Sequence, residues 1–159
     1  MAHRPRLRKA AMKTSIIYPV VLAALLFSGC ARESPPPDAK LAALRAKLET
    51  AQTQADMNEL SAETSQHQDR KLAKLEELVR NDLHDEELKG KFDQDAALWR
   101  EYRNVHAEFV GDMYQGGSIR PLIYNEAFTR LTEERITALI AEMGPELNVR
   151  EDGQGGWTE

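Results

Sequence analysis

The residues of this sequence that could do acid–base or metal chemistry are scattered. Beyond the leader, the histidines are His67, His84 and His106, and their spacing matches no common metal site. Neighbouring carboxylates could form an acid–base pair, but a chain with 26 acidic residues is expected to place them on solvated helix faces. These carboxylates are Glu86-Glu87, Asp93 with Asp95, and Glu133-Glu134. We therefore predict no catalytic residue, no metal site and no cofactor.

The glycine-rich segment at residues 116–118 does not have the pattern of a phosphate-binding loop. It follows a predicted helix instead of a strand, and it lacks the lysine that a P-loop requires. No nucleophile elbow is present, and His106 lies on an apolar stripe, where we expect an interior histidine. The sequence therefore predicts a protein that is not an enzyme.

Cys30 is the only cysteine, so the chain cannot form an internal disulfide. The segment Leu26-Phe27-Ser28-Gly29-Cys30 resembles the lipobox of bacterial lipoproteins. This resemblance implies that the leader is removed before Cys30 and that Cys30 then carries the acyl chains, palmitate among them. Several acyl chains would anchor the protein stably to membrane lipid.

Residues 1–29 have the pattern of a signal peptide. The segment contains five basic residues and no acidic ones. The basic residues precede Ile16–Phe27, which is an uncharged apolar stretch. As a helix this stretch would be about 18 Å long, which is short of the roughly 30 Å core of a bilayer. Ala31 stands where an aspartate would resemble an inner-membrane retention signal. In a Gram-negative source, the absence of that aspartate resembles an outer-membrane address facing the periplasm.

Residues 30–37 are predicted to be the lipidated cysteine and a tether, because three consecutive prolines favour an extended chain. From Asp38, a suitable helix N-cap, Leu41, Leu44 and Leu48 recur at helical spacing. Two arrangements fit residues 38–80: one long helix, or two helices that meet near residue 64. We favour one helix whose polar middle, residues 61–69, is exposed, since neither Gly nor Pro interrupts it.

Two further helices are predicted. One runs from about Asp85 to Tyr114 after a turn at residues 81–84, and it carries two apolar stripes, so we expect it to pack on two neighbours. The other starts near Pro121 and stops at Gly144-Pro145. We expect an all-α, antiparallel bundle of about three helices at residues 38–145, no strand, and a flexible tail at residues 146–159.

Four segments in the helical region resemble, in order and spacing, the lysozyme inhibitor LprI-like N-terminal domain family. They are Thr53-Gln54-Ala55-Asp56-Met57-Asn58, Trp99-x-x-Tyr102-Arg103-Asn104, Tyr114-x-Gly116-Gly117-Ser118 and Leu131-Thr132-x-x-Arg135-Ile136-x-x-Leu139. The resemblance spans about residues 50–142. It implies a small exported helical domain and, for the family, an activity against lysozyme.

The sequence departs from this family at its cysteines. Members commonly have cysteines at places that correspond here to Leu60, Ala107 and Ala127, and none of these can form a bridge. A disulfide is often worth about 2–5 kcal/mol in a small secreted domain. The body of this protein is therefore expected to depend on helix packing alone.

The matched residues are expected to have structural roles. They are Trp99, Tyr102, Arg103, Gly116, Gly117, Ser118 and Arg135. Arg103 could bind an acid of the last helix or carbonyl groups near Gly117, and Arg135 could pair with an acid of the preceding helix. The two glycines would allow a turn that a Cβ would obstruct.

Residues 30–159 contain 16 basic and 26 acidic residues, a net charge of −10 that suits a basic partner and not nucleic acid. One hypothesis is an envelope lipoprotein that occludes the substrate cleft of a basic lysozyme. The alternative is a structural or adaptor lipoprotein that docks on another envelope protein through the leucines at 41–48. Candidate contacts for the first hypothesis are Asp82, Asp85, Glu86, Glu87, Gln115 and Arg120.

Overall fold

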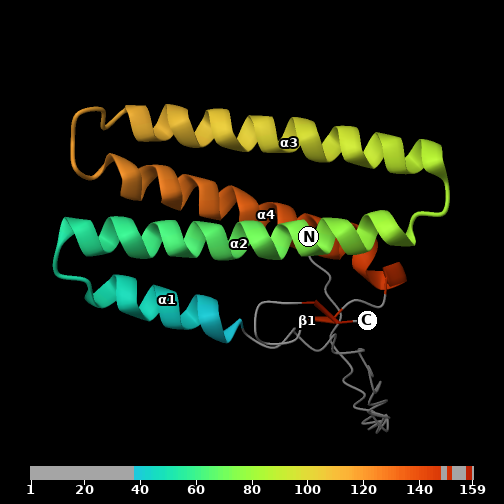
Figure 1. The fold of residues 1–159 in the computed structure, drawn as a ribbon, viewed down its shortest axis with the longest axis horizontal. Coiled ribbons are helices and arrows are strands. Elements are labelled where there is room, and N and C mark those ends of the chain that lie inside the picture. The colour runs from blue at the N-terminus through green and yellow to red at the C-terminus, as the bar shows by residue number, and fades with distance from the viewer. Residues whose placement is uncertain (1–37, 148–149, 152–156, 159) are drawn as a thin grey trace, which may run out of the picture. The chain divides into compact units, whose positions relative to one another are not determined.

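The computed structural model describes residues 38–147, 150–151 and 157–158. The fold is all-α, as predicted, with four helices in this part of the chain (Figure 1). They are α1 (Ala39–Thr50), α2 (Gln54–Asp82), α3 (Glu86–Asp112) and α4 (Arg120–Leu147). The leader, the tether with Cys30 and most of the tail lie outside the described residues.

The prediction of one helix from 38 to 80 was wrong, because the chain turns at residues 51–53. Thr53 caps α2 by accepting a hydrogen bond from the Asp56 amide at 3.1 Å, and Ala51 has an extended backbone. The turn lets α1 fold back along α2, which buries Leu44. In one straight helix that leucine would have no neighbour to pack against. A cap, and neither a glycine nor a proline, ends α1.

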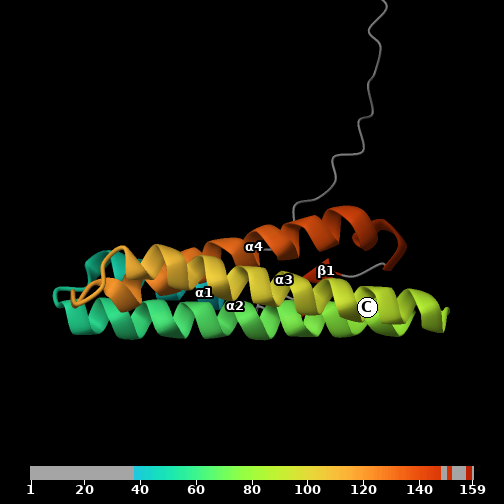
Figure 2. The ribbon, with the colours of Figure 1, turned by 90° about the horizontal axis from the view of Figure 1, so that it is seen from above.

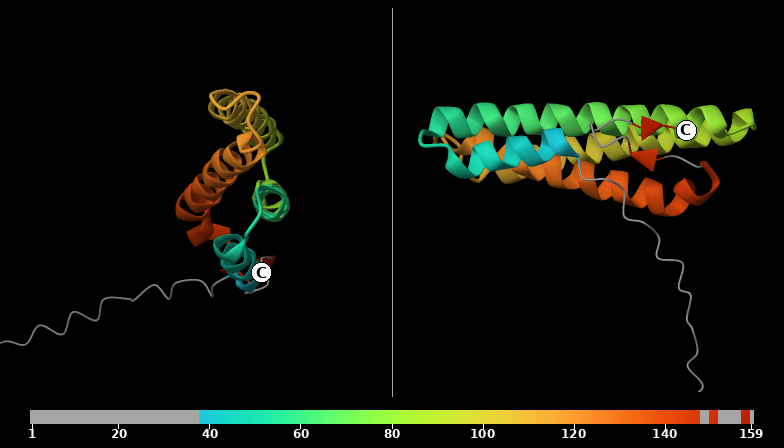
Figure 3. Two further views of the ribbon diagram at one scale, coloured as in Figure 1. Left: turned by 90° about the vertical axis from the view of Figure 1, so that its left-hand side faces the viewer. Right: turned by 90° about the horizontal axis from the view of Figure 1, so that it is seen from below.

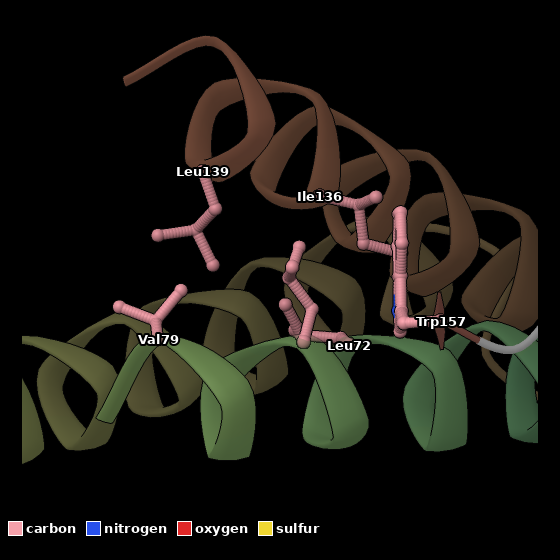
Figure 4. Packing of buried hydrophobic residues seen from close by; sticks show 6 residues of the cluster. Leu72, Val79, Ile136, Leu139 and Trp157 are labelled. Carbon is pink, nitrogen blue, oxygen red and sulfur yellow. The ribbon is translucent and has the colours of Figure 1, made fainter. Parts of the chain in front are cut away.

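Helix α4 packs against both α2 and α3, whereas α1 packs against α2 (Figure 1, Figure 2). Consecutive helices run in opposite directions, as expected from short connections. The apolar core lies between α2 and α4, as Figure 4 shows. Its buried members are Leu72, Leu75, Val79, Ile136, Leu139 and Trp157.

Two expectations about the C-terminal end were wrong: that the last helix stops at Gly144-Pro145, and that the chain forms no strand. Helix α4 continues through Gly144-Pro145 to Leu147, since a proline so near the end removes only one late backbone hydrogen bond. Beyond it, β1 (Arg150–Glu151) pairs antiparallel with β2 (Trp157–Thr158). Trp157 is buried against α2, and its indole nitrogen donates a hydrogen bond to the Lys71 carbonyl at 3.0 Å. Burial of this large ring holds the end of the chain to the bundle.

The polar segment at residues 61–69 is mostly buried, contrary to the expectation of an exposed middle. Ser61, Thr64 and Ser65 face the interior of the bundle, and each hydroxyl donates to a carbonyl of its own helix at 2.8–2.9 Å. Because these hydroxyls are satisfied locally, the helix can bury them without the penalty of an unpaired polar group. The inner face of α2 is therefore polar in its first half and apolar in its second.

Candidate functional site

Arg103 lies at the junction of α2, α3 and α4 and is only 4% exposed. Its Nη1 donates to Asp69 at 2.6 Å and to the Thr132 hydroxyl at 3.2 Å. Its guanidinium group stacks over the Phe128 ring, 3.8 Å from the centroid, and over Trp99 at 5.0 Å. The partners considered from the sequence, an acid of α4 or carbonyls near Gly117, were wrong. The acid is Asp69, which α2 contributes from its position beside α3.

Two other ion pairs join the same three helices. Arg135 of α4 donates to Asp95 of α3, which is the kind of pairing expected from the sequence. Arg100 of α3 donates to the buried Glu76 of α2. Burial raises the pKa of Glu76 above its ordinary value, against the opposing effect of Arg100 and the other nearby arginines. The family-motif residues Trp99, Arg103 and Arg135 thus form a buried to half-buried junction that positions α3.

The segment between α3 and α4 forms a tight loop. Gly116 has a φ of 81°, a conformation that other residues rarely adopt, and a Cβ at Gly117 would lie 3.2 Å from the Tyr114 carbonyl oxygen. The loop is held to α2 because Asn58 donates to the Ser118 carbonyl at 3.0 Å. The first and third matched segments therefore meet here. Residues 115–119 are exposed at this end of the bundle.

The acidic turn at residues 82–87 lies at the opposite end of the bundle (Figure 1). Asp85 caps α3 by accepting from the Leu88 amide at 2.9 Å, while Glu86 and Glu87 pair with lysines of the same helix. The hydrogen bond from Lys89 lowers the pKa of Glu86. About 25 residues of α2 separate the two ends, or roughly 37 Å.

This separation divides the contacts predicted from the sequence. Asp82, Asp85, Glu86 and Glu87 lie at one end of the bundle, and Gln115 and Arg120 lie at the other. Arg120 is held by Asp112 at 2.6 Å. The two groups cannot form one compact contact surface.

A buried charged cluster was not expected from the sequence. Asp38, the N-cap of α1, lies 2.9 Å from Nε2 of His67 and 3.4 Å from Nζ of Lys71. Burial acts to raise the pKa of Asp38, but the Leu41 amide, His67 and Lys71 together hold it below its ordinary value. The sequence did contain a sign of this cluster, because His67 and Lys71 are four residues apart and so lie on the same face of α2. The cluster fixes the start of α1 on α2.

Helix α3 contacts two neighbours, as expected, chiefly α4 and to a smaller extent α2, but its second apolar stripe is exposed. Its members Leu98, Tyr102, Val105 and Phe109 are 55–65% exposed. The buried residues of α3 are instead Ala96, Arg103, Ala107 and Gly111, and the partly buried Phe92 and Trp99 pack against the apolar core. His106, expected in the interior, lies half-buried beside Tyr102, with ring centroids 5.8 Å apart. Tyr102, taken from the sequence as a structural motif residue, therefore belongs to the exposed face.

Comparison with known families now bears on this arrangement. The family model described as Lysozyme inhibitor LprI matches residues 45–139, which is more than half of the chain. This chain belongs to that family. No curated protein and no solved structure gave a significant match. The matched region extends from within α1 to late in α4, so it includes the Arg103 junction and the loop after α3.

For an LprI family member, the missing cysteines are replaced by packing. Ala107 and Ala127, at places where the resemblance puts cysteines, are buried in α3 and α4, and Leu60 is half-buried in α2. The family is one of lysozyme inhibitors and not of enzymes. Within the part of the chain that the structure describes, no three potential ligand side chains gather as a metal site would need. Of the helices described, none is long and apolar enough to span a membrane.

Proposed function

We propose that this protein is a lipid-anchored lipoprotein of the bacterial cell envelope that inhibits lysozyme by covering its substrate cleft. The observation that carries the proposal is the match of residues 45–139 to the Lysozyme inhibitor LprI family. The role needs no reaction of its own. Binding alone would exclude the cell-wall substrate from the enzyme.

The charge of the chain supports a basic partner. Residues 30–159 carry a net charge of −10, and lysozymes of the common animal type are strongly basic. Opposite net charges accelerate encounter and favour a complementary contact, and the effect weakens with salt. We therefore expect inhibition to be stronger at low than at moderate ionic strength.

The lipid anchor is proposed from Cys30 and the segment before it. Acyl chains on Cys30 and the tether that follows would hold the helical body near the membrane surface, on the periplasmic side of the outer membrane in a Gram-negative source. Radiolabelled palmitate should be incorporated into the wild-type chain in cells and not into a Cys30→Ser variant. Labelling of neither chain would contradict the anchor without bearing on inhibition.

The adaptor alternative has lost the features that suggested it. Leu44 is buried against α2, Leu41 and Leu48 are half-buried, and the polar segment at 61–69 faces the interior. None of these is a free docking face. Inhibition of lysozyme is therefore the function that we propose.

The test is a titration of lysozyme acting on cell walls with the full chain purified in mild detergent, at low and moderate salt. A detergent blank and an unrelated acidic protein at equal concentration serve as controls. We expect lysis to slow in proportion to the added chain, more strongly at low salt. Undiminished lysis at a large molar excess would refute the proposal.

A further inference from the structure

The outer face of α3 carries a continuous row of large apolar side chains. Leu98, Tyr102, Val105 and Phe109 follow one another at spacings of four, three and four residues, so they form one line along the helix. The row is about 17 Å long. Helix α3 lies at the edge of the bundle, with α4 beside its inner face (Figure 3). Nothing in the described part of the chain covers the row.

The row forms a shallow, open depression. Its lining includes all four apolar side chains together with Glu101 and His106. Met113 and Tyr114, 68% and 45% exposed, extend the apolar surface toward the loop at residues 115–119. Large exposed apolar patches with a polar rim are typical of protein-binding surfaces. Aromatic residues are common among those that dominate binding energy.

The charges beside the row have one sign. Glu101 and Glu108 are exposed along one side of it. The two arginines of this stretch, Arg100 and Arg103, point to the other face of α3, where they bind Glu76 and Asp69. The pairing of both arginines with acids of α2 keeps their positive charge away from the row and leaves its rim acidic.

This charge pattern decides between possible occupants. A second copy of the chain would bring its own Glu101 and Glu108 to the same seam, where like charges oppose pairing. An anionic membrane surface would be repelled for the same reason. A partner with lysines or arginines around an apolar side chain would instead gain both burial and attraction.

We propose that the outer face of α3, from Leu98 to Phe109, is the surface that binds a basic protein partner. An apolar side chain of the partner occupies the depression, and its basic residues face Glu101 and Glu108. The identity of the partner as lysozyme rests on the proposed function; the choice of surface does not.

The test compares matched variants of the full chain in detergent. Leu98→Ser/Phe109→Ser removes the row, and Leu88→Ser is the control, because Leu88 is an exposed leucine of the same helix, 50% exposed and ten residues before the row. Glu101→Gln/Glu108→Gln removes the acidic rim, and Glu63→Gln/Glu77→Gln removes two exposed acids of α2. Unchanged helicity and unfolding midpoint confirm that each variant is folded.

Binding is measured by calorimetry to an animal-type lysozyme and, as a second basic protein, to cytochrome c. We expect the row variant to bind at least about tenfold more weakly than wild type, and the rim variant about threefold more weakly with less salt dependence. Both controls should stay within about twofold.

The two proposals fail separately. If wild type binds and inhibits lysozyme but the row variant does so equally well, the α3 surface is refuted and the proposed function stands. If wild type binds cytochrome c through the row but does not inhibit lysozyme, the surface stands and the proposed function is refuted. If wild type binds neither basic protein, both are refuted.

Discussion

Both faces of α3 carry large apolar side chains, but only one of the two faces is covered by the bundle. The inner face buries two alanines, a glycine and Arg103 and packs Phe92 and Trp99 partly against the core, while the outer face exposes Leu98, Tyr102, Val105 and Phe109. Small residues on the inner face let α4 approach closely, and the arginine is satisfied by Asp69 and Thr132. A helix arranged for stability alone would not leave a second row of large apolar side chains exposed. The exposed row is therefore better explained by binding than by folding.

The largest expected loss of stability comes from removing Arg103, the charged residue of the inner face. Arg103→Ala removes the ion pair with Asp69, the hydrogen bond to Thr132 and the stacking on Phe128. Asp69 is half exposed and stays solvated without its partner, so the expected cost of about 3 kcal/mol comes mainly from the lost packing and stacking of the buried guanidinium group. Urea denaturation followed by circular dichroism measures this loss. Arg130→Ala, which removes the exposed pair with Glu134, should cost less than about 0.5 kcal/mol. Equal losses would mean that the junction is not what holds α3.

The buried cluster of Asp38, His67 and Lys71 gives a second test of how much a buried charge stabilises the fold, here where α1 meets α2. Asp38→Asn keeps a good N-cap but leaves His67 and Lys71 without the carboxylate, which we expect to cost about 2 kcal/mol near neutral pH. The folded-state pKa of Asp38 is lowered, so its contribution is complete above the ordinary pKa of 3.8 and is lost as the pH falls through the lower folded value. Wild type and variant should therefore converge in acid.

Denaturation series at several pH values would measure this convergence. The matched control is Asp85→Asn, at the N-cap of α3, because Asp85 is exposed and has no role in the buried cluster. Its effect should stay within about 0.5 kcal/mol. A gap between wild type and Asp38→Asn that stays constant into acid would contradict the assignment.

The glycines of α3 sharpen the contrast in packing. A Cβ at Gly111 would lie 3.2 Å from the Cβ of Tyr124 on α4, whereas nothing lies within 4 Å of a Cβ at Gly90. Gly111→Leu should therefore destabilise the fold by about 1–2 kcal/mol through overpacking. Gly90→Leu should stabilise it by up to about 1 kcal/mol, because glycine is a poor helix former. Thermal unfolding compares the two, and the same sign for both would be inconsistent with close packing at Gly111.

The smallest expected effect on stability is at the outer face. Phe109→Ser should change the free energy of unfolding by no more than about 0.5 kcal/mol, because the ring is 65% exposed. Phe128→Ser, which removes a half-buried ring beneath Arg103, should cost about 3 kcal/mol. Denaturant midpoints measure both. A large loss at Phe109 would show that the outer row supports the fold.

Local signals in the sequence predicted where the helices begin and end better than they predicted which helices pack together. The turn before α3, the loop at Gly116 and Gly117 and the start of α4 follow from caps, glycine and proline, which act within a few residues. The turn at 51–53 was missed, although Thr53 followed by Asp56 has the spacing of a helix start. A cap can start a new helix without a glycine or proline before it, so the absence of those residues did not require one continuous helix.

The candidate site was predicted less well than the fold. The matched residues identified the family, but the sequence did not tell that Arg103 and Arg135 lie inside the bundle while Tyr102 lies outside it. The polar segment at 61–69 continues the helical spacing of Leu72 and Val79 backwards along α2, which was the available sign that it is buried. Polarity alone was a poor guide, because hydroxyls that bond their own helix can be buried.

By itself, the sequence determined the helical character, most boundaries and the acidity of the chain, since these depend on neighbours in sequence and on composition. Only the tertiary structure decided which stripe of α3 is covered and which arginines are withdrawn from the surface. Periodicity shows that a helix has an apolar face. Whether that face is buried depends on how many helices stand beside it, and α3 has α4 on one side and no helix of the described chain on the other.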